Sequence, residues 1–151
     1  MVRSMQGRRQ EYFEAILQLR DTPDEVYEFA LQELDRAGIH IAKDTLVRGG
    51  RDLYIADNKF GKQLGKTLQQ KFGGEVIVTA SLYGQKNGEE IFRLTILFRP
   101  IPFKKNDTVL YKGEEYVVKV VGKELLLQHT KTGQKAHVKY REMGRMKVLS
   151  H

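Results

Sequence analysis

The stretch "RDLYIADNKFGKQLGKT", residues 51–67, runs from an alternating apolar segment into one that looks like a phosphate-binding loop. A P-loop needs G-x-x-x-x-G-K-[ST], because four residues between the glycines let the backbone wrap the phosphates. Here three residues separate Gly61 from Gly65. The spacing therefore argues against a nucleotide-binding loop.

A helix accounts for the same residues better. Its apolar side chains recur every four positions, as on one helical face; they are Phe60, Leu64, Leu68 and Phe72. A glycine inside a helix costs about 1 kcal/mol relative to alanine, so something must offset Gly61 and Gly65. Close approach of the helix to a sheet is the favoured explanation, and close approach to an RNA backbone is the alternative.

The segment upstream predicts a strand and then a capped helix. "EYFEAILQLR", residues 11–20, has the length and composition of a strand and stops at "DTPDE". Thr22 is the predicted N-cap, Pro23 takes the first helical position, and Glu25 completes a capping box. The helix is predicted to end at Gly38. Its outer side is acidic and carries Asp24, Glu25, Glu28, Glu33 and Asp35.

The rest of the first hundred residues completes an α+β pattern. "IHIAKDTLV" and "RDLYIAD" are strands on either side of Gly49 and Gly50, and the glycine-containing helix follows them. "EVIVTASLYG" and "EEIFRLTILFRP" form a hairpin whose link, "QKNG", contains an Asn-Gly turn signal. The predicted domain, residues 8–100, is β-α-β-β-α-β-β in two layers, with both helices on one face of a sheet.

The residues "PIPF" at 100–103 mark a predicted domain boundary. Beyond them strand-length segments alternate with turns; the segments are "NDTVLY", "EEYVVKVV", "ELLLQHT", "QKAHVKY" and "RMKVL". Five short strands in about fifty residues predict a small closed β-barrel of the SH3-like kind over residues 101–151.

Positive charge is concentrated in this second part. The chain has 151 residues and a net charge of +7, and residues 101–151 carry +6 of it, from 11 basic and 5 acidic side chains. Such asymmetry favours a polyanionic partner, usually nucleic acid. No apolar run is long enough for a membrane span, and the N-terminus has no signal-peptide core. We therefore expect a cytoplasmic protein with no membrane partner.

The residue inventory argues against catalysis. Because the chain has no cysteine, thiol chemistry and cysteine zinc sites are excluded. His129 and His137 flank the "TKTG" turn and can face each other across a hairpin, but a third metal ligand is missing. No G-x-S-x-G elbow is present. We predict a protein that is not an enzyme, with no catalytic residue, metal, cofactor or small-molecule substrate.

Basic side chains are the candidate RNA-binding residues, because several stand at turns where they can reach phosphates. In the predicted barrel they are Lys104, Lys105, Lys112, Lys123, Lys131, Lys135, Lys139, Arg141, Arg145 and Lys147. In the first domain they are Arg48, Arg51, Lys59, Lys62 and Lys66. A solvated basic surface without a partner is the open alternative. The absence of an RNP motif or GXXG clamp favours recognition of folded RNA by shape over sequence-specific reading of single strands.

Three segments in order resemble the nonsense-mediated-decay protein three family: "YFEAILQLR", "GGRDLYIADNKFGKQLGKTLQQKFGG" and "TASLYGQKNGEEIFRLTILFRP". The phrase G-x-D-x-Y at Gly50, Asp52 and Tyr54 is the most specific part. The family comprises the eukaryotic nuclear-export adaptor of the large ribosomal subunit and its archaeal homologues. The resemblance implies binding to the large ribosomal subunit, to its rRNA and proteins, near the tRNA exit region, during maturation or surveillance.

In that family a zinc module precedes a ribosomal-protein-like domain and a barrel similar to the N-terminal domain of translation factor five A. "NDTVLYKGEEYVVKVV" and "TKTGQKAHVKYREM" are similar to this barrel. The zinc cysteines are absent, which implies a fragment or a shortened, archaeal-type homologue lacking an export tail. "VGKE" stands in place of the factor's lysine-bearing loop, so Lys123 does not inherit the role of that loop.

A protein–protein adaptor is the alternative function. In this hypothesis the acidic first helix docks a basic partner, and charge reversal at Glu28 and Glu33 abolishes the docking.

Overall fold

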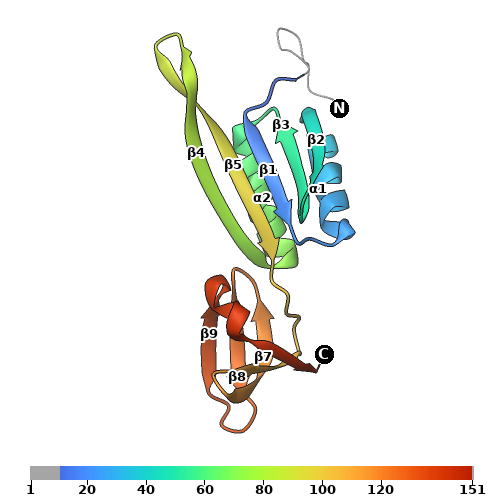
Figure 1. The fold of residues 1–151 in the computed structure, drawn as a ribbon, viewed down its shortest axis with the longest axis vertical. Coiled ribbons are helices and arrows are strands. Elements are labelled where there is room, and N and C mark those ends of the chain that lie inside the picture. Colours follow the sequence, from blue (N-terminus) through green and yellow to red (C-terminus); the bar gives the residue numbers. More distant parts are fainter. Residues whose placement is uncertain (1–10, 151) are drawn as a thin grey trace. The chain divides into compact units, whose positions relative to one another are not determined.

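A computed structural model describes residues 11–150, which form two compact units (Figure 1). The first unit holds residues 11–68 together with Val76–Arg99. The second holds Gln69–Glu75 together with the chain from Pro100 onward. No helix in the described range is both long enough and apolar enough to cross a membrane.

The first unit has the predicted order of elements. These are β1 (Ala15–Arg20), α1 (Asp24–Arg36), β2 (Ile41–Val47), β3 (Gly50–Ile55), α2 (Asn58–Phe72), β4 (Gly74–Lys86) and β5 (Glu89–Pro100). The strands form one sheet in the order β2-β3-β1-β5-β4. β1 lies at the centre, antiparallel to β3 and parallel to β5.

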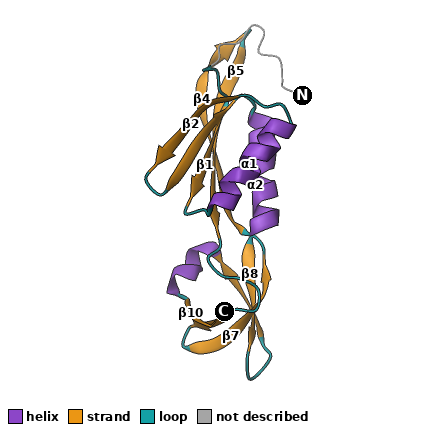
Figure 2. Ribbon diagram, turned by 90° about the vertical axis from the view of Figure 1, so that its right-hand side faces the viewer, coloured by secondary structure: helices purple, strands orange, loops and turns teal. Residues whose placement is uncertain are grey.

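Both helices cover the same face of this sheet, as predicted (Figures 1 and 2). Alternation along β1 shows why: Ala15, Leu17 and Leu19 are fully buried, whereas the residues between them are half-buried. The helices contribute the other half of the core through Val26, Ala30, Leu34, Leu64 and Leu68. Each large aliphatic side chain buried in this way contributes about 1.5–3 kcal/mol.

Gly61 and Gly65 let α2 approach the sheet closely, which decides between the two explanations left open by the sequence. Both glycines are buried. A Cβ on Gly65 would lie 2.7 Å from Cγ2 of Ile96, and one on Gly61 would lie 3.0 Å from Cδ1 of Ile55. The glycines therefore face the sheet, and the lysines of α2 point away from it.

Polar groups fix the start of α2 to two strands. The Asp57 carboxylate accepts a hydrogen bond from the Phe60 N–H at 2.8 Å, which caps the helix. Glu14 accepts from the Asn58 N–H at 3.0 Å, and the Asn58 side chain donates to the carbonyl of Phe92 at 2.9 Å. The two carboxylates also interact favourably with the partial positive charge at the N-terminal end of the helix.

The predicted cap of α1 is wrong by one position, and its predicted end is right. Pro23, in an extended conformation, is the N-cap rather than the first helical residue, and no side chain of the Thr22–Glu25 box makes a capping hydrogen bond. Because the ψ of Pro23 is 160°, this residue is extended and the helical conformation begins at Asp24. At the other end Gly38 has φ 69°, and Ile39 N–H donates to Leu34 C=O, as in a Schellman motif.

β4 and β5 form the predicted hairpin and continue past the rest of the sheet as a two-stranded arm (Figure 1). Asn87 (φ 54°) and Gly88 (φ 79°) occupy the turn, and positive φ at both positions is what an Asn-Gly turn provides. β5 pairs with β1 from Leu94 to Phe98, so residues 89–93 lie beyond that pairing.

The second unit contains the five predicted strands. These are β6 (Thr108–Tyr111), β7 (Glu114–Val121), β8 (Glu124–His129), β9 (Lys135–Lys139) and β10 (Lys147–Ser150). They form an antiparallel sheet in the order β10-β6-β7-β8-β9. Its core has strand residues such as Val109, Val118, Leu125, Leu127 and Val138.

A short 3-10 helix, η1 (Tyr140–Arg145), joins β9 to β10 and was not predicted. Met143 from η1 and Met146 just after it are buried in the core of the second unit. The sequence "YREMGRM" shows little periodicity because so short a helix turns few side chains toward the core.

We expect Gly65→Ala to lower the free energy of unfolding by about 1 kcal/mol. The helix gains about 1 kcal/mol from the alanine, but overpacking against buried Ile96 costs about 1–3 kcal/mol. Urea denaturation measures the difference. Gly84→Ala in β4 is the control, because a Cβ there meets nothing within 4 Å. A Gly65→Ala protein that is more stable than the wild type would contradict close packing at this position.

Candidate nucleic-acid interface

The basic residues predicted in the second unit are all exposed and lie mainly at strand ends and turns. Lys104 and Lys105 stand before β6, in a turn where the Asp107 carboxylate accepts the Lys104 N–H at 2.8 Å. Lys112 lies in the β6–β7 turn, Lys123 lies just before β8, and the remaining members follow β8. The structure brings some of these cations to shared hollows and leaves six outside both of them: Lys104, Lys105, Lys123, Lys135, Lys139 and Arg141.

One hollow, called the Lys112 hollow below, collects three cations from two parts of the unit. Lys112 lies in the β6–β7 turn, and Arg145 and Lys147 come from the end of η1 and the start of β10. Lys112 (φ 51°) and Gly113 (φ 79°) form this turn. Segments more than 30 residues apart therefore present their positive charge to the same space.

Leu110, Tyr111 and Glu142 complete the lining of the Lys112 hollow. The Tyr111 hydroxyl donates to the Glu142 carboxylate at 3.3 Å, and the Lys112 ammonium lies 5.3 Å from the Tyr111 ring centroid. Three cations against one carboxylate leave a net positive charge beside an aromatic ring. This combination suits an anion such as a phosphate group.

A second, shallower hollow lies beside the β8–β9 turn and contains Lys119 and Lys131. Lys119 was missed by the sequence analysis. The segment "VVKVV" could have indicated it, because a lysine within a strand, next to buried Val118, must point outward. The rest of the lining comes from β7, the end of β8 and the turn itself, including Gln128 and Gly133.

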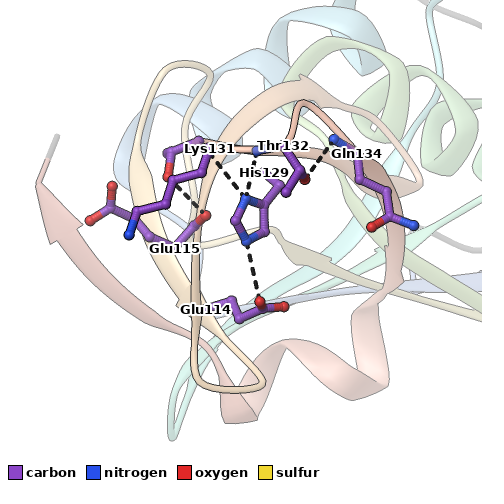
Figure 3. Close-up of polar contacts among 7 residues, drawn as sticks. Glu114, Glu115, His129, Lys131, Thr132 and Gln134 are labelled. Carbon is purple, nitrogen blue, oxygen red and sulfur yellow. Dashed lines mark hydrogen bonds and ion pairs between the residues drawn. The ribbon is translucent and has the colours of Figure 1, made fainter.

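His129 holds this turn in shape (Figure 3). Its Nδ1 accepts the backbone N–H groups of Lys131 at 3.1 Å and Thr132 at 3.2 Å. With Nδ1 acting as an acceptor, the neutral ring carries its proton on Nε2, which lies 3.3 Å from a Glu114 carboxylate oxygen. The ring also packs edge-on against Tyr116, with 5.1 Å between centroids.

The two histidines that flank the turn have different partners. His137 is exposed and its Nδ1 lies 3.1 Å from Glu124 Oε1, whereas His129 is directed into the turn. Within residues 11–150, no three histidine or carboxylate side chains gather as metal ligands. The role of His129 is to order the backbone around Lys131.

In the first unit, four of the five predicted residues are exposed. Lys59, Lys62 and Lys66 lie on the outer side of α2, and Arg48 lies next to the β2–β3 turn. Arg51 differs: it is half-buried, donates to Asp44 at 3.0 Å and stacks 4.3 Å from the Tyr27 ring centroid. Its guanidinium is therefore used within the protein.

Tyr27, Asp44 and Arg51 form a linked group between α1 and the edge of the sheet. The Tyr27 hydroxyl donates to Asp44, and this hydrogen bond raises the pKa of Tyr27. The phenol therefore stays protonated and keeps donating at neutral pH.

A protein-family model matches the first part of the chain. Residues 12–99, more than half of the chain, match the model described as "NMD3, second domain". These residues correspond closely to the first unit, including the G-x-D-x-Y phrase and α2. No curated protein matches the chain.

We expect His129→Leu to loosen the β8–β9 turn, because the N–H groups of Lys131 and Thr132 lose their acceptor. Amide hydrogen exchange measured by NMR should become faster at these two residues. His129→Asn should preserve most of the protection, since its side-chain oxygen can accept from nearby backbone N–H groups.

His137→Leu is the matched control, because this exposed histidine bonds to Glu124 and not to the turn. Unchanged exchange at Lys131 and Thr132 in His129→Leu would show that the imidazole is dispensable for the turn.

Proposed function

The chain belongs to the NMD3 family, and on this premise we propose that it is a non-enzymatic protein that binds RNA of the large ribosomal subunit. The family is linked to export and biogenesis of the large ribosomal subunit. The proposed role lies in maturation or surveillance of that subunit, with rRNA and ribosomal proteins as partners.

The observation that carries the RNA-binding part is the Lys112 hollow. Lys112, Arg145 and Lys147 line one space from separate segments, and Glu142, the acidic residue there, is hydrogen-bonded to Tyr111. Long cationic side chains at turns reach phosphates without a close fit between the two backbones. The second hollow, with Lys119 and Lys131, supplies further contacts of the same kind.

The charge of the second unit supports the same proposal. Residues 101–151 carry a net charge of +6, and their buried core is apolar apart from Asp107. The charge is thus carried on the surface, where it attracts a polyanion over a distance of about 8 Å at physiological salt. We propose that this five-stranded unit is an SH3-like barrel similar to the N-terminal domain of translation factor five A.

The exposed lysines of α2 extend the proposal to the first unit. Lys59, Lys62 and Lys66 are exposed on the side of α2 opposite the buried glycines. The helix is held by the sheet on one side, so its lysine-bearing side is available to phosphates. Arg51 is left out of the proposed set because Asp44 and Tyr27 already engage it.

We expect Arg145→Glu to weaken co-sedimentation with purified large ribosomal subunits. Loss of one phosphate contact should lower the slope of log K against log salt concentration by about one. Arg36→Glu is the matched control: it makes the same change in net charge at an exposed arginine of α1.

Binding that is absent, or that does not weaken as salt rises, would contradict the proposed function. Equal loss in both variants would mean that net charge, and not the Lys112 hollow, controls binding. Binding lost on charge reversal at Glu28 in α1 would instead favour the protein–protein adaptor.

A further inference from the structure

Cationic and aromatic side chains form a continuous row across the first sheet. The Lys43 ammonium lies 5.5 Å from the Tyr54 ring centroid, and the Tyr54 and Phe13 rings meet edge to face at 4.9 Å. The Arg93 guanidinium lies between two rings, 3.9 Å from that of Phe13 and 3.6 Å from that of Tyr83. We call Lys43, Tyr54, Phe13, Arg93 and Tyr83 the aromatic row.

The aromatic row crosses the sheet from edge to edge. Its members come from β2, β3, the residues before β1, β5 and β4, which follow the order of the strands in the sheet. The Arg93 Nε also donates to the Phe13 carbonyl at 3.3 Å, which fixes the centre of the row. At about 4.8 Å between neighbouring strands, five strands span about 19 Å.

The aromatic row lies on the face of the sheet that the helices leave open. Leu53 and Ile55 of β3 are fully buried toward the helices, so Tyr54 between them points to the other face. In β5, Arg93 likewise alternates with the inward positions Leu94 and Ile96. The row therefore contributes nothing to the core beneath α1 and α2, and both of its ends, Lys43 and Tyr83, are exposed.

The cations of the aromatic row differ from Arg20 and Arg51 of the same sheet. Arg20 is paired with Asp52 at 2.7 Å and Arg51 with Asp44 at 3.0 Å, so their charges are balanced within the protein. No carboxylate of the described chain is paired with Arg93 or Lys43. Their positive charge is therefore left for a partner of negative charge.

We propose that this open sheet face binds unpaired RNA nucleotides, whose bases stack on the aromatic row while their phosphates meet Lys43 and Arg93. Bases stack on aromatic rings, and a sheet face with two or three rings is a known way to hold single-stranded RNA. For a protein partner we would expect this sheet face to be apolar, with its cations balanced by carboxylates. Instead, the face combines flat rings with unbalanced positive charge.

The inference deepens the proposed function, on which it rests, by naming unpaired nucleotides as the ligand of the first unit. It needs no linear RNP motif, because the rings come from separate strands. Stacking of this kind is tolerant of sequence, since every base has a flat π-face.

The test uses the full chain and a 12-nucleotide oligouridine carrying 2-aminopurine, whose fluorescence reports stacking. We expect Tyr83→Ala to weaken binding about five-fold or more, as for loss of one stacked base. Tyr83→Phe should bind like the wild type, because it keeps the ring. Tyr83 is 55% exposed, so its removal leaves the core intact.

Phe92→Ala is the matched control. Phe92 is the neighbour of Arg93 in the same strand, is 42% exposed, and points to the opposite face. Its removal should leave oligouridine binding unchanged. Thermal unfolding of each variant confirms that the fold is retained.

Two outcomes would overturn the inference: no binding of oligouridine by the wild type, or equal binding by the wild type and Tyr83→Ala. Failure of the proposed function is a separate result, because it is measured with large subunits and Arg145→Glu. If subunits bind through the Lys112 hollow while Tyr83→Ala changes nothing, the inference alone fails.

Discussion

The close contact of α2 with the sheet at Gly61 and Gly65 is the constraint on which the first unit depends. Ile96, at the centre of that contact, belongs to β5, which is paired with central β1. A side chain at either glycine would push the helix outward and open the buried layer beneath it. The polar bonds of Glu14 and Asn58 at the start of α2 keep the helix in register with the same strands.

Seating both helices on one face leaves the two faces of the sheet with different chemistry. The helix-covered face is apolar and fully buried at positions such as Leu17, Leu53 and Phe98. The open face carries rings and charges, some balanced internally, as in Arg20 with Asp52. Because successive residues of a strand point to opposite faces, the strands can encode a core and a binding surface at once. The stability of the unit and its proposed recognition of RNA are thus separable by mutation.

The second unit separates stability from charge in another way. Its core is built mainly from strand residues and two methionines, whereas the cations of the Lys112 hollow stand in a turn, at the end of η1 and at the start of β10. His129 shows how a turn of this kind is kept in shape: one imidazole accepts two backbone N–H groups beside Lys131. Rigid turns lower the conformational entropy lost when a lysine meets a phosphate, which favours binding.

The sequence by itself determined the order of elements in both units, because that order follows from local signals. The apolar repeat from Phe60 to Phe72, the Asn87-Gly88 turn and the glycine after α1 each act within a few residues. The error in the predicted cap at Thr22 is also local, since the helix begins one residue later than predicted, after the extended Pro23. The tertiary structure alone decided what the glycines of α2 contact, which cations share a hollow, and that Phe13 and Arg93, 80 residues apart, are neighbours. These features depend on strand order and register, and pairing between distant strands is set by the packing of the whole core rather than by any one segment.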